Sequence, residues 1–157
     1  MSDELLEINV NVIGVVRNEM KEAGARPDIQ DIVSEIKLYD RYKDGLDRLD
    51  EYSHVIVLYR FHIDRQPGPK PMRQHAHNQD SMPVVGIFAL RGSNRPNRIG
   101  ICMAKLLEVG SDTVKISGCD ALDGSPVIDI KPYGKEDSIP DVKVSSWQLE
   151  WEKQRAR

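Results

Sequence analysis

Short apolar segments in which hydrophobic and polar residues alternate are the feature that most restricts the fold of this chain. Residues 8–16 and 32–38 alternate with period two, and residues 99–109 repeat the pattern over a longer stretch. Such alternation is typical of a β-strand with one buried face. Residues 54–62 contain instead a continuous apolar run, Val55-Ile-Val-Leu-Tyr59, whose β-branched and aromatic content predicts a strand buried on both faces.

Turn signals separate the remaining strands. We expect strands at 84–90, at 114–116 and at 127–130. Asp123-Gly124 lies between the last two, and an Asp-Gly pair favours a β-hairpin. Helical spacing occurs over residues 39–52, where one or two short turns fit. This pattern of short strands with hardly any helical period predicts a mostly-β protein, a small closed antiparallel β-barrel with short helices.

The length and the ends of the chain suggest a simple organisation. The 157 residues are about one domain's worth, and we expect a barrel domain over residues 1–137 with a C-terminal extension over 138–157. Trp147 and Trp151 are too large to leave in water, so we expect the extension to pack on the barrel or on a partner subunit. Residues 64–83 form a long proline-rich loop, which is typical of functional or disordered segments.

Composition points to a soluble, cytoplasmic protein. No run of 18 apolar residues exists, so we expect no membrane span. The acidic N-terminus lacks the basic-then-apolar order of a signal peptide. Cys102 and Cys119 lie in apolar segments, and two reduced, buried thiols are favoured over a disulfide.

Charge is distributed unevenly along the chain. The net charge is −3, but residues 60–98 contain seven Lys/Arg against two acidic residues, a local charge of +5. The rest of the chain therefore carries −8. An acidic body with one basic segment predicts a localised anionic partner. The alternative is chance clustering in a solvated loop.

The sharpest local motif is the turn Arg91-Gly-Ser-Asn-Arg-Pro-Asn-Arg98. Arginine presents a planar fork of donors suited to carboxylate and phosphate groups. Gly and Asn residues let the backbone turn tightly and expose its amides, and Pro96 stiffens the loop. Three guanidinium groups so close together repel one another unless an anion is present. We interpret this turn as an anion-binding loop, against the alternative of a solvated surface turn.

Two further motifs carry both a functional and a structural interpretation. Phe61-His62 at the end of the apolar strand can stack and hydrogen-bond a base, or can be a core Phe beside a half-exposed His. The segment Asp120-Ala-Leu-Asp-Gly-Ser-Pro126 has two carboxylates around a tight turn. These are either plain turn residues or acceptors for ribose hydroxyls or a cation.

Several common chemistries have no motif in this chain. The glycine-rich dinucleotide and phosphate-loop patterns, His-Glu-x-x-His and Gly-x-Ser-x-Gly are missing. His75 and His77 could share one side of a strand, but no third ligand stands at a useful spacing. We therefore predict no metal site.

Taken together, these segments resemble the TsaA-like family, whose characterised enzymes are tRNA methyltransferases of the TrmO type. The resemblance spans roughly residues 8–133. The matching blocks are Ile13-Gly-Val-Val-Arg17, Gly45-Leu-Asp-Arg-Leu-Asp-Glu-Tyr-Ser-His54, Phe61-His62, Gly86-Ile-Phe-Ala-Leu-Arg-Gly-Ser-Asn-Arg-Pro-Asn-Arg-Ile-Gly100 and Asp120-Ala-Leu-Asp-Gly-Ser-Pro-Val-Ile-Asp-Ile-Lys-Pro-Tyr133.

The resemblance implies a homodimeric β-barrel that binds S-adenosylmethionine and methylates N6 of threonylcarbamoyladenosine at position 37 of a tRNA. The cofactor-binding residues implied in this way are Arg26, Phe61, His62, Arg91, Ile101, Asp120, Ala121, Leu122, Asp123 and Gly124. The basic segment is then the expected face for the tRNA anticodon arm. The expected contacts are Arg65, Lys70, Arg73, Arg95, Asn97 and Arg98.

Catalytic roles follow from the chemistry of that substrate. Its nitrogen lies between an adenine ring and a carbonyl, so it is a poor nucleophile until its proton is removed or its anionic form is stabilised. We assign Arg91 as electrostatic stabiliser, Asp123 as orienter or base, and His62 as an alternative base. Two rival readings are an S-adenosylmethionine-binding sensor that methylates nothing, and a methyltransferase acting on another small or nucleotide substrate.

Overall fold

The computed structural model describes residues 6–22, 28–64 and 68–155. Within it the chain forms two compact units. The first contains residues 1–64 and 99–133, and the second contains residues 65–98 and 134–157.

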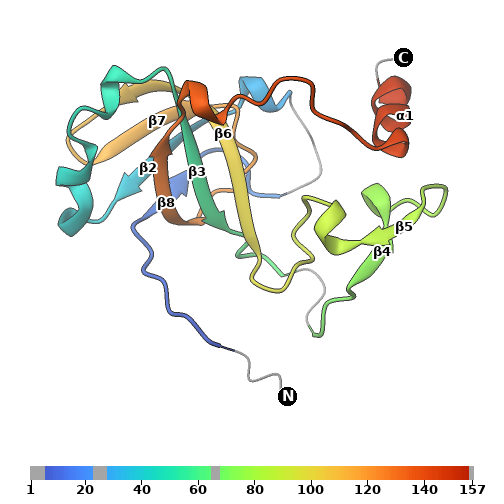
Figure 1. The fold of residues 1–157 in the computed structure, drawn as a ribbon. Coiled ribbons are helices and arrows are strands. Elements are labelled where there is room, and N and C mark those ends of the chain that lie inside the picture. The colour runs from blue at the N-terminus through green and yellow to red at the C-terminus, as the bar shows by residue number, and fades with distance from the viewer. Residues whose placement is uncertain (1–5, 23–27, 65–67, 156–157) are drawn as a thin grey trace. The chain divides into compact units, whose positions relative to one another are not determined.

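The first unit is a closed six-stranded antiparallel β-barrel (Figure 1). Its strands follow the order β1-β2-β7-β6-β3-β8 around the barrel. Their bounds are β1 Gly14–Arg17, β2 Val33–Leu38, β3 His54–Arg60, β6 Ile99–Val109, β7 Thr113–Ser117 and β8 Pro126–Pro132. The predicted mostly-β fold and closed barrel are thus confirmed.

Alternating side chains from every strand fill the barrel. On β3, Val55, Val57 and Tyr59 are almost fully buried, whereas Ile56 and Leu58 between them are only half-buried. The prediction that β3 is buried on both faces was therefore wrong, because the outer face of a barrel strand remains open to solvent. The interior set from other strands includes Val16, Ile36, Ala104, Val114, Ile116 and Val127.

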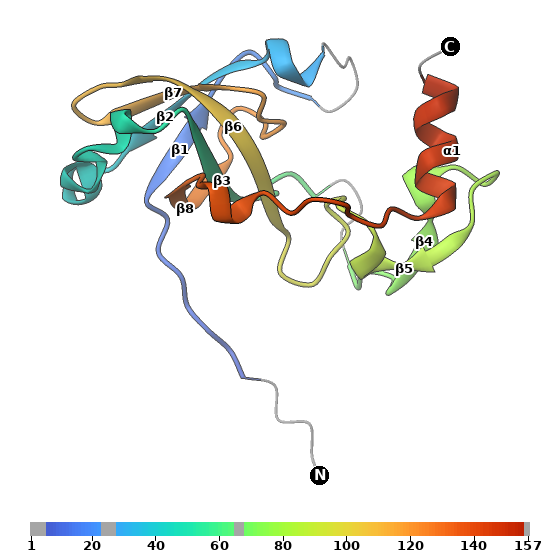
Figure 2. The same ribbon diagram turned by 45° about the horizontal axis from the view of Figure 1, so that its top comes forward.

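Two other predictions about the strands need correction. The first strand begins at Gly14 rather than at residue 8, and residues 6–13, called the N-terminal arm below, precede it (Figure 2). Asp123-Gly124 forms a turn but no hairpin, because β7 pairs with β2 and β6 whereas β8 pairs with β1 and β3. The turn signal was right, since Gly124 has φ +82°, but the partner strand was misassigned.

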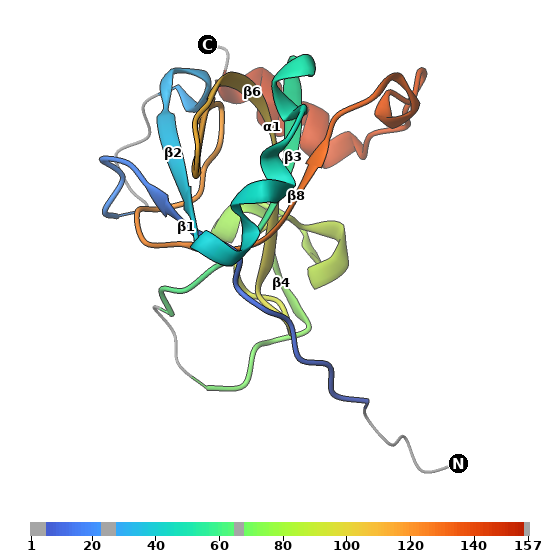
Figure 3. The same ribbon diagram turned by 90° about the vertical axis from the view of Figure 1, so that its left-hand side faces the viewer.

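Short 3₁₀ helices complete the barrel unit. Helix η1 covers Ile29–Asp31, and helices η2 (Asp40–Leu46) and η3 (Leu49–Glu51) connect β2 to β3, drawn in teal in Figure 3. The latter two confirm the short helical turns expected over 39–52. Among the described residues, no helix combines the length and the apolar character needed to span a bilayer.

The two cysteines form a disulfide, so the expectation of two free thiols was wrong. Cys102 faces the interior on β6, and Cys119 follows β7, which is the neighbouring strand. Their Cα atoms lie 5.5 Å apart, within the range that a disulfide requires. Both side chains are buried, as predicted. A sequence separation of 17 residues conceals this proximity.

The second unit combines a small sheet with a C-terminal helix. Strands β4 (Arg73–His75) and β5 (Val84–Gly86) pair antiparallel, so residues 64–83 are not simply a loop. The expected strand 84–90 stops at Gly86, where helix η5 (Ile87–Ala89) begins. The remaining elements are η4 (Ala76–Asn78), η6 (Lys135–Asp137) and α1 (Ser146–Arg155).

Both tryptophans of α1 pack against a residue of this same unit. The His77 ring stacks on Trp151 with centroids 4.4 Å apart, and meets Trp147 edge-on at 6.0 Å. His77 Nε2 also lies 3.1 Å from Gln148 Oε1. Residues 134–157 therefore associate with residues 65–98. The domain boundary expected between residues 137 and 138 stays a prediction.

Candidate functional site

The candidate site lies at one end of the barrel. Strand β1 ends there at Arg17 and β3 ends there at Arg60. Residues 118–125, called the connecting loop below, link β7 to β8 at the same end. Because antiparallel neighbours alternate in direction, residues following β1, β3 and β7 meet here.

A tyrosine inside the barrel anchors the first carboxylate of the connecting loop. The Tyr59 hydroxyl donates to Asp120 Oδ1 at 2.8 Å, and the Tyr59 ring is only 1% exposed. Phe61 meets that ring edge-on, with centroids 5.2 Å apart, and is half-buried. Tyr59, near the end of β3, thus contacts both the exposed carboxylate of Asp120 and the aromatic ring of Phe61.

The imidazole of His62 packs against the loop on the same side. Its Nδ1 lies 3.2 Å from the hydroxyl of Ser125, which is itself 1% exposed. A methyl group at Gly124 would lie 3.5 Å from His62 Nε2. Glycine is required at 124 because its φ is +82°, and its lack of a side chain also leaves the imidazole exposed.

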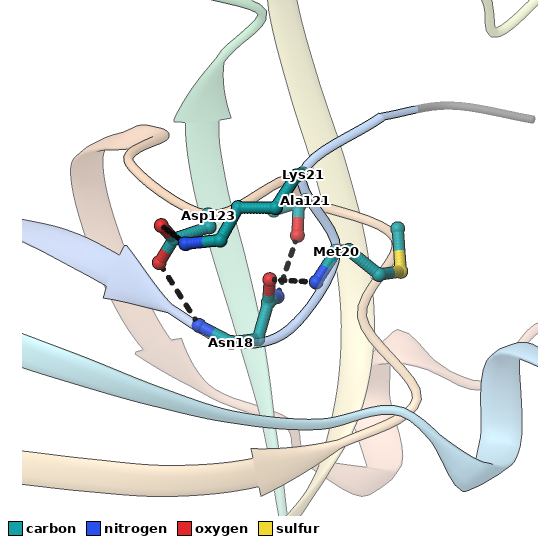
Figure 4. Close-up of polar contacts among 5 residues, drawn as sticks. All are labelled: Asn18, Met20, Lys21, Ala121 and Asp123. Atoms are coloured by element: carbon teal, nitrogen blue, oxygen red, sulfur yellow. Dashed lines mark hydrogen bonds and ion pairs between the residues drawn. The ribbon is translucent and has the colours of Figure 1, made fainter.

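Asn18 joins three segments of this end of the barrel, and Figure 4 shows its bonds to two of them, the connecting loop and the turn after β1. Its Nδ2 donates to Ser34 Oγ at 2.8 Å and to the Ala121 carbonyl at 2.9 Å. Its Oδ1 accepts from the Met20 amide at 3.0 Å. One amide side chain therefore fixes β2, the connecting loop and the turn after β1.

Asp123 is held by the same turn. Its Oδ1 accepts from the Asn18 amide at 3.1 Å, and its Oδ2 pairs with Lys21 Nζ at 2.6 Å (Figure 4). Its own amide donates to the Met20 carbonyl at 2.8 Å. Two hydrogen bonds lower the pKa of the Asp123 carboxyl below its ordinary value. The bond from the Lys21 side chain has the larger effect, and the bond from the Asn18 backbone amide has the next largest. Both carboxylate oxygens are engaged, so Asp123 is a weak base.

The structure brings together most of the predicted cofactor-binding residues. Phe61 and His62 adjoin the segment Asp120–Gly124 at the end of the barrel. Ile101 lies near the same end of the barrel, where it pairs with Leu58, but it faces outward and is 46% exposed, since Gly100 and Cys102 take the inward positions of β6. Arg26 lies outside the described residues.

The arginine-bearing turn belongs to the second unit. Arg91 is exposed, and Arg98 has left-handed φ of +53°. Arg95 folds back on its own loop, because its Nη1 donates to the Leu90 carbonyl at 3.1 Å and to the Gly92 carbonyl at 3.4 Å. Asn94 donates to Gln74 Oε1 at 3.1 Å, which ties the turn to β4. Arg95 therefore helps to shape the turn.

The other predicted tRNA contacts are also in this unit. Arg73 and Asn97 are exposed, and Lys70 is half-buried. Arg65 lies outside the described residues.

Sequence reasoning missed Asn18, Lys21 and Ser125. Asn18 and Asp123 are 105 residues apart in the chain, so no local pattern links them. The one available signal was that Asn18 directly follows a strand, where a polar side chain often bonds to a neighbouring loop.

The arrangement suits a nucleoside-like ligand better than a metal. It offers an exposed carboxylate, an aromatic ring and an imidazole within one loop cluster. Within the described part of the chain, no three His, Cys, Asp or Glu side chains gather in a way that could hold a metal ion.

Comparisons with known proteins point in one direction. A family model described as the tRNA-methyltransferase O N-terminal domain matches residues 16–137. A probable S-adenosyl-L-methionine-binding protein of Methanothermobacter thermautotrophicus is 38% identical over 136 residues, which are 85% of this chain and 93% of that protein. The tRNA (adenine(37)-N6)-methyltransferase of Escherichia coli is 34% identical over 144 residues, 85% of this chain and 61% of that protein.

A solved structure shares the fold. The crystal structure of TrmO from Pseudomonas aeruginosa superposes with a TM-score of 0.71 at 28% sequence identity, covering 88% of this chain and 62% of that one. The chain thus spans nearly the whole of the archaeal relative but about three fifths of the two bacterial proteins.

Proposed function

Because the chain belongs to the tRNA-methyltransferase O N-terminal domain family, we propose that it is an S-adenosylmethionine-dependent tRNA methyltransferase. The substrate is N6 of threonylcarbamoyladenosine at position 37 of a tRNA. The observation that carries the proposal is the cluster of Phe61, His62 and Asp120–Gly124 at one barrel end. Its groups match a cofactor that consists of an adenine, a ribose and a methionine carboxylate.

Each part of the cofactor has a matching residue in this proposal. Asp120, oriented by Tyr59, accepts hydrogen bonds from the ribose hydroxyls. Phe61 stacks on the adenine. Arg26 and Arg91 are the candidates for the carboxylate, and Ile101 provides an apolar contact. The main chain of Ala121, Leu122 and Gly124 lines the remainder.

The proposed chemistry separates the roles of His62 and Asp123. S-adenosylmethionine supplies an electrophilic methyl group carried on a sulfonium. The exposed imidazole of His62 accepts the proton of the substrate nitrogen. Asp123 orients the connecting loop, since its lowered pKa and its bonds to Lys21 and Asn18 favour a permanently ionised group. The role of Arg91 as stabiliser of the anionic nitrogen is proposed from the family resemblance alone, because Arg91 belongs to the second unit.

The second unit provides the proposed tRNA contacts. Lys70, Arg73 and Arg98 neutralise phosphates of the anticodon arm, and affinity then falls steeply with salt. Arg65, Arg95 and Asn97 complete the set. We also propose that the protein acts in the cytoplasm as a homodimer, which would double the basic surface.

A second candidate function has one specific observation in its favour. The archaeal relative that matches this chain nearly end to end is named as a binding protein for S-adenosyl-L-methionine, without a substrate. A sensor of this kind would bind the cofactor with little dependence on salt and would ignore tRNA.

Transfer of a labelled methyl group tests the proposal. The protein is incubated with labelled S-adenosylmethionine and total tRNA that carries threonylcarbamoyladenosine. The tRNA is then digested to nucleosides, and mass spectrometry identifies the nucleoside that carries the label. We expect label on that nucleoside alone and none when tRNA lacks the threonylcarbamoyl group. His62→Ala should reduce turnover more strongly than it weakens cofactor binding. Cofactor binding without any transfer to tRNA would favour the sensor.

A further inference from the structure

The N-terminal arm has the pattern of a strand but lies exposed. Ile8 is 83% exposed and Val10 is 58% exposed, and Leu6 and Val12 are exposed as well. Isolated exposed apolar residues are common, but four of them at alternate positions form a continuous apolar surface, which proteins usually bury against another surface.

The alternation gives the arm one apolar face. Side chains two residues apart in a strand point to the same side. Gly14 and Val16 are buried in the barrel, and Ile8, Val10 and Val12 continue their register toward the N-terminus. The other face carries Glu7, Asn9 and Asn11 and then Ile13. Over residues 6–12, an arm extended as a strand would therefore present apolar side chains on the barrel side only.

Strand β8 has an edge to which such a strand can pair. β1 pairs with β8 only at Pro126 and Val127, whereas β3 pairs with β8 as far as Pro132. Within the described ranges, no strand pairs with the other edge of residues 128–132. The amide of Ile130 donates to Asp129 Oδ1 at 3.0 Å, so a side chain supplies its acceptor.

A groove of about 720 Å³ lies along this edge, at the opposite end of the barrel from the candidate site. Helices η2 and η3 form its other wall. Its aliphatic lining consists of Ile13, Leu38, Leu46, Leu49, Ile130 and Pro132, and its remaining lining consists of Tyr42, Gly45, Tyr52 and the charged residues Asp47, Arg48, Glu51 and Asp129. The apolar face of the arm is complementary to the aliphatic part of this groove, which lies beside an open strand edge.

We propose that two copies of this protein exchange their arms, so that residues 6–12 of each copy pair with the open edge of β8 in the other. Val10 and Val12 then lie in the groove. Within the arm, Ile13 lines the groove, whereas residues 6–12 run away from the barrel (Figure 2), which is the conformation of an open protomer in such an exchange. The inference rests on the homodimer proposed above and names its surface.

Hydrogen exchange at several protein concentrations tests this arrangement. We expect the arm amides to be protected in the dimer and to lose protection as dilution yields monomers. Protection that does not depend on concentration would mean that each arm folds onto its own barrel, and would overturn the exchange. An unprotected arm in a dimer would overturn it as well.

A pair of double variants separates the arm's two faces. Val10→Asp with Val12→Asp puts carboxylates into the groove and should weaken dimerisation by tenfold or more, on the order of magnitude expected for buried valines. Asn9→Asp with Asn11→Asp adds the same charge on the polar face and should change the dissociation constant little. Analytical ultracentrifugation measures both.

The outcomes distinguish this inference from the proposed homodimer. A wild-type chain that remains monomeric at every concentration would refute both. A dimer that neither double variant weakens would leave the homodimer in place and refute the arm exchange.

Discussion

The Tyr59 hydroxyl donates to Asp120 Oδ1 at 2.8 Å, and this bond joins the packed interior of the barrel to the connecting loop. Tyr59 lies over Gly100 of the neighbouring strand and meets Phe61 at its edge. Core packing and the candidate cofactor site therefore share one side chain. Changes that move Tyr59 should alter both stability and cofactor affinity.

Tyr59→Phe tests the hydrogen bond alone. It removes a bond to a charged acceptor that is also open to water, so we expect a loss of about 1 kcal/mol in the free energy of unfolding. Affinity for S-adenosylmethionine should fall by roughly three- to tenfold, because Asp120 loses its orientation. Urea unfolding and calorimetry measure the two effects. Tyr39→Phe, at an exposed tyrosine, is the control. Unchanged affinity would show that Asp120 orientation does not matter.

Gly100→Ala tests the packing of the same tyrosine. An added methyl group would lie 2.7 Å from Tyr59 Cε2 and 2.8 Å from Cε1, so the ring must move. We expect a destabilisation of about 1–3 kcal/mol together with weaker cofactor binding. Gly45→Ala is a matched control because nothing lies within 4 Å of a methyl group there. Equal stability of the two variants would contradict the tight contact.

Lys21→Ala should raise the pKa of Asp123. The hydrogen bond from Lys21 is the largest cause of the lowered value, and the Asn18 amide remains in the variant. A carboxyl whose pKa is lowered on folding stabilises the native state above its unfolded pKa, which is about 4, and this contribution disappears as the pH falls through the lowered value.

Carboxyl chemical shifts followed by NMR during an acid titration report this pKa directly. The midpoint for Asp123 should lie below that of an ordinary aspartate in the wild type and move toward it in Lys21→Ala. Lys43→Ala serves as the control, since Lys43 lies on η2. Identical midpoints in the two variants would show that Lys21 does not pair with Asp123 in solution.

The barrel was predictable because its strands carry their pattern locally. Residues 33–38 and 99–109 show period-two alternation in the sequence, residues 54–60 show a continuous apolar run, and each strand formed close to its expected place. The same local pattern misled the prediction for the arm. Residues 8–12 alternate as a strand does, but strand pairing also needs a partner, which the pattern does not specify.

Long-range contacts were the part that the sequence could not supply. Phe61, His62 and Asp120 could be singled out by residue type and resemblance, but the bonds from Asn18 and Lys21 to Asp123 span more than 100 residues. The same limit applies to Cys102 and Cys119, since their pairing depends on β6 and β7 being neighbours. Residue types identified the connecting loop from the sequence, but only the folded barrel shows which residues hold that loop in place.

The disulfide should contribute measurably to stability. Cys102 and Cys119 close a loop with a sequence separation of 17 residues, for which the chain-entropy argument gives about 3 kcal/mol. Alkylation of the unfolded, unreduced protein should detect no free thiols by mass spectrometry. A reducing agent should then lower the midpoint of urea unfolding. The double variant Cys102→Ala, Cys119→Ala should be insensitive to the reducing agent, which separates the cross-link from packing. Two free thiols in the purified protein would instead support the expectation from composition and predict no response to reduction in the wild type.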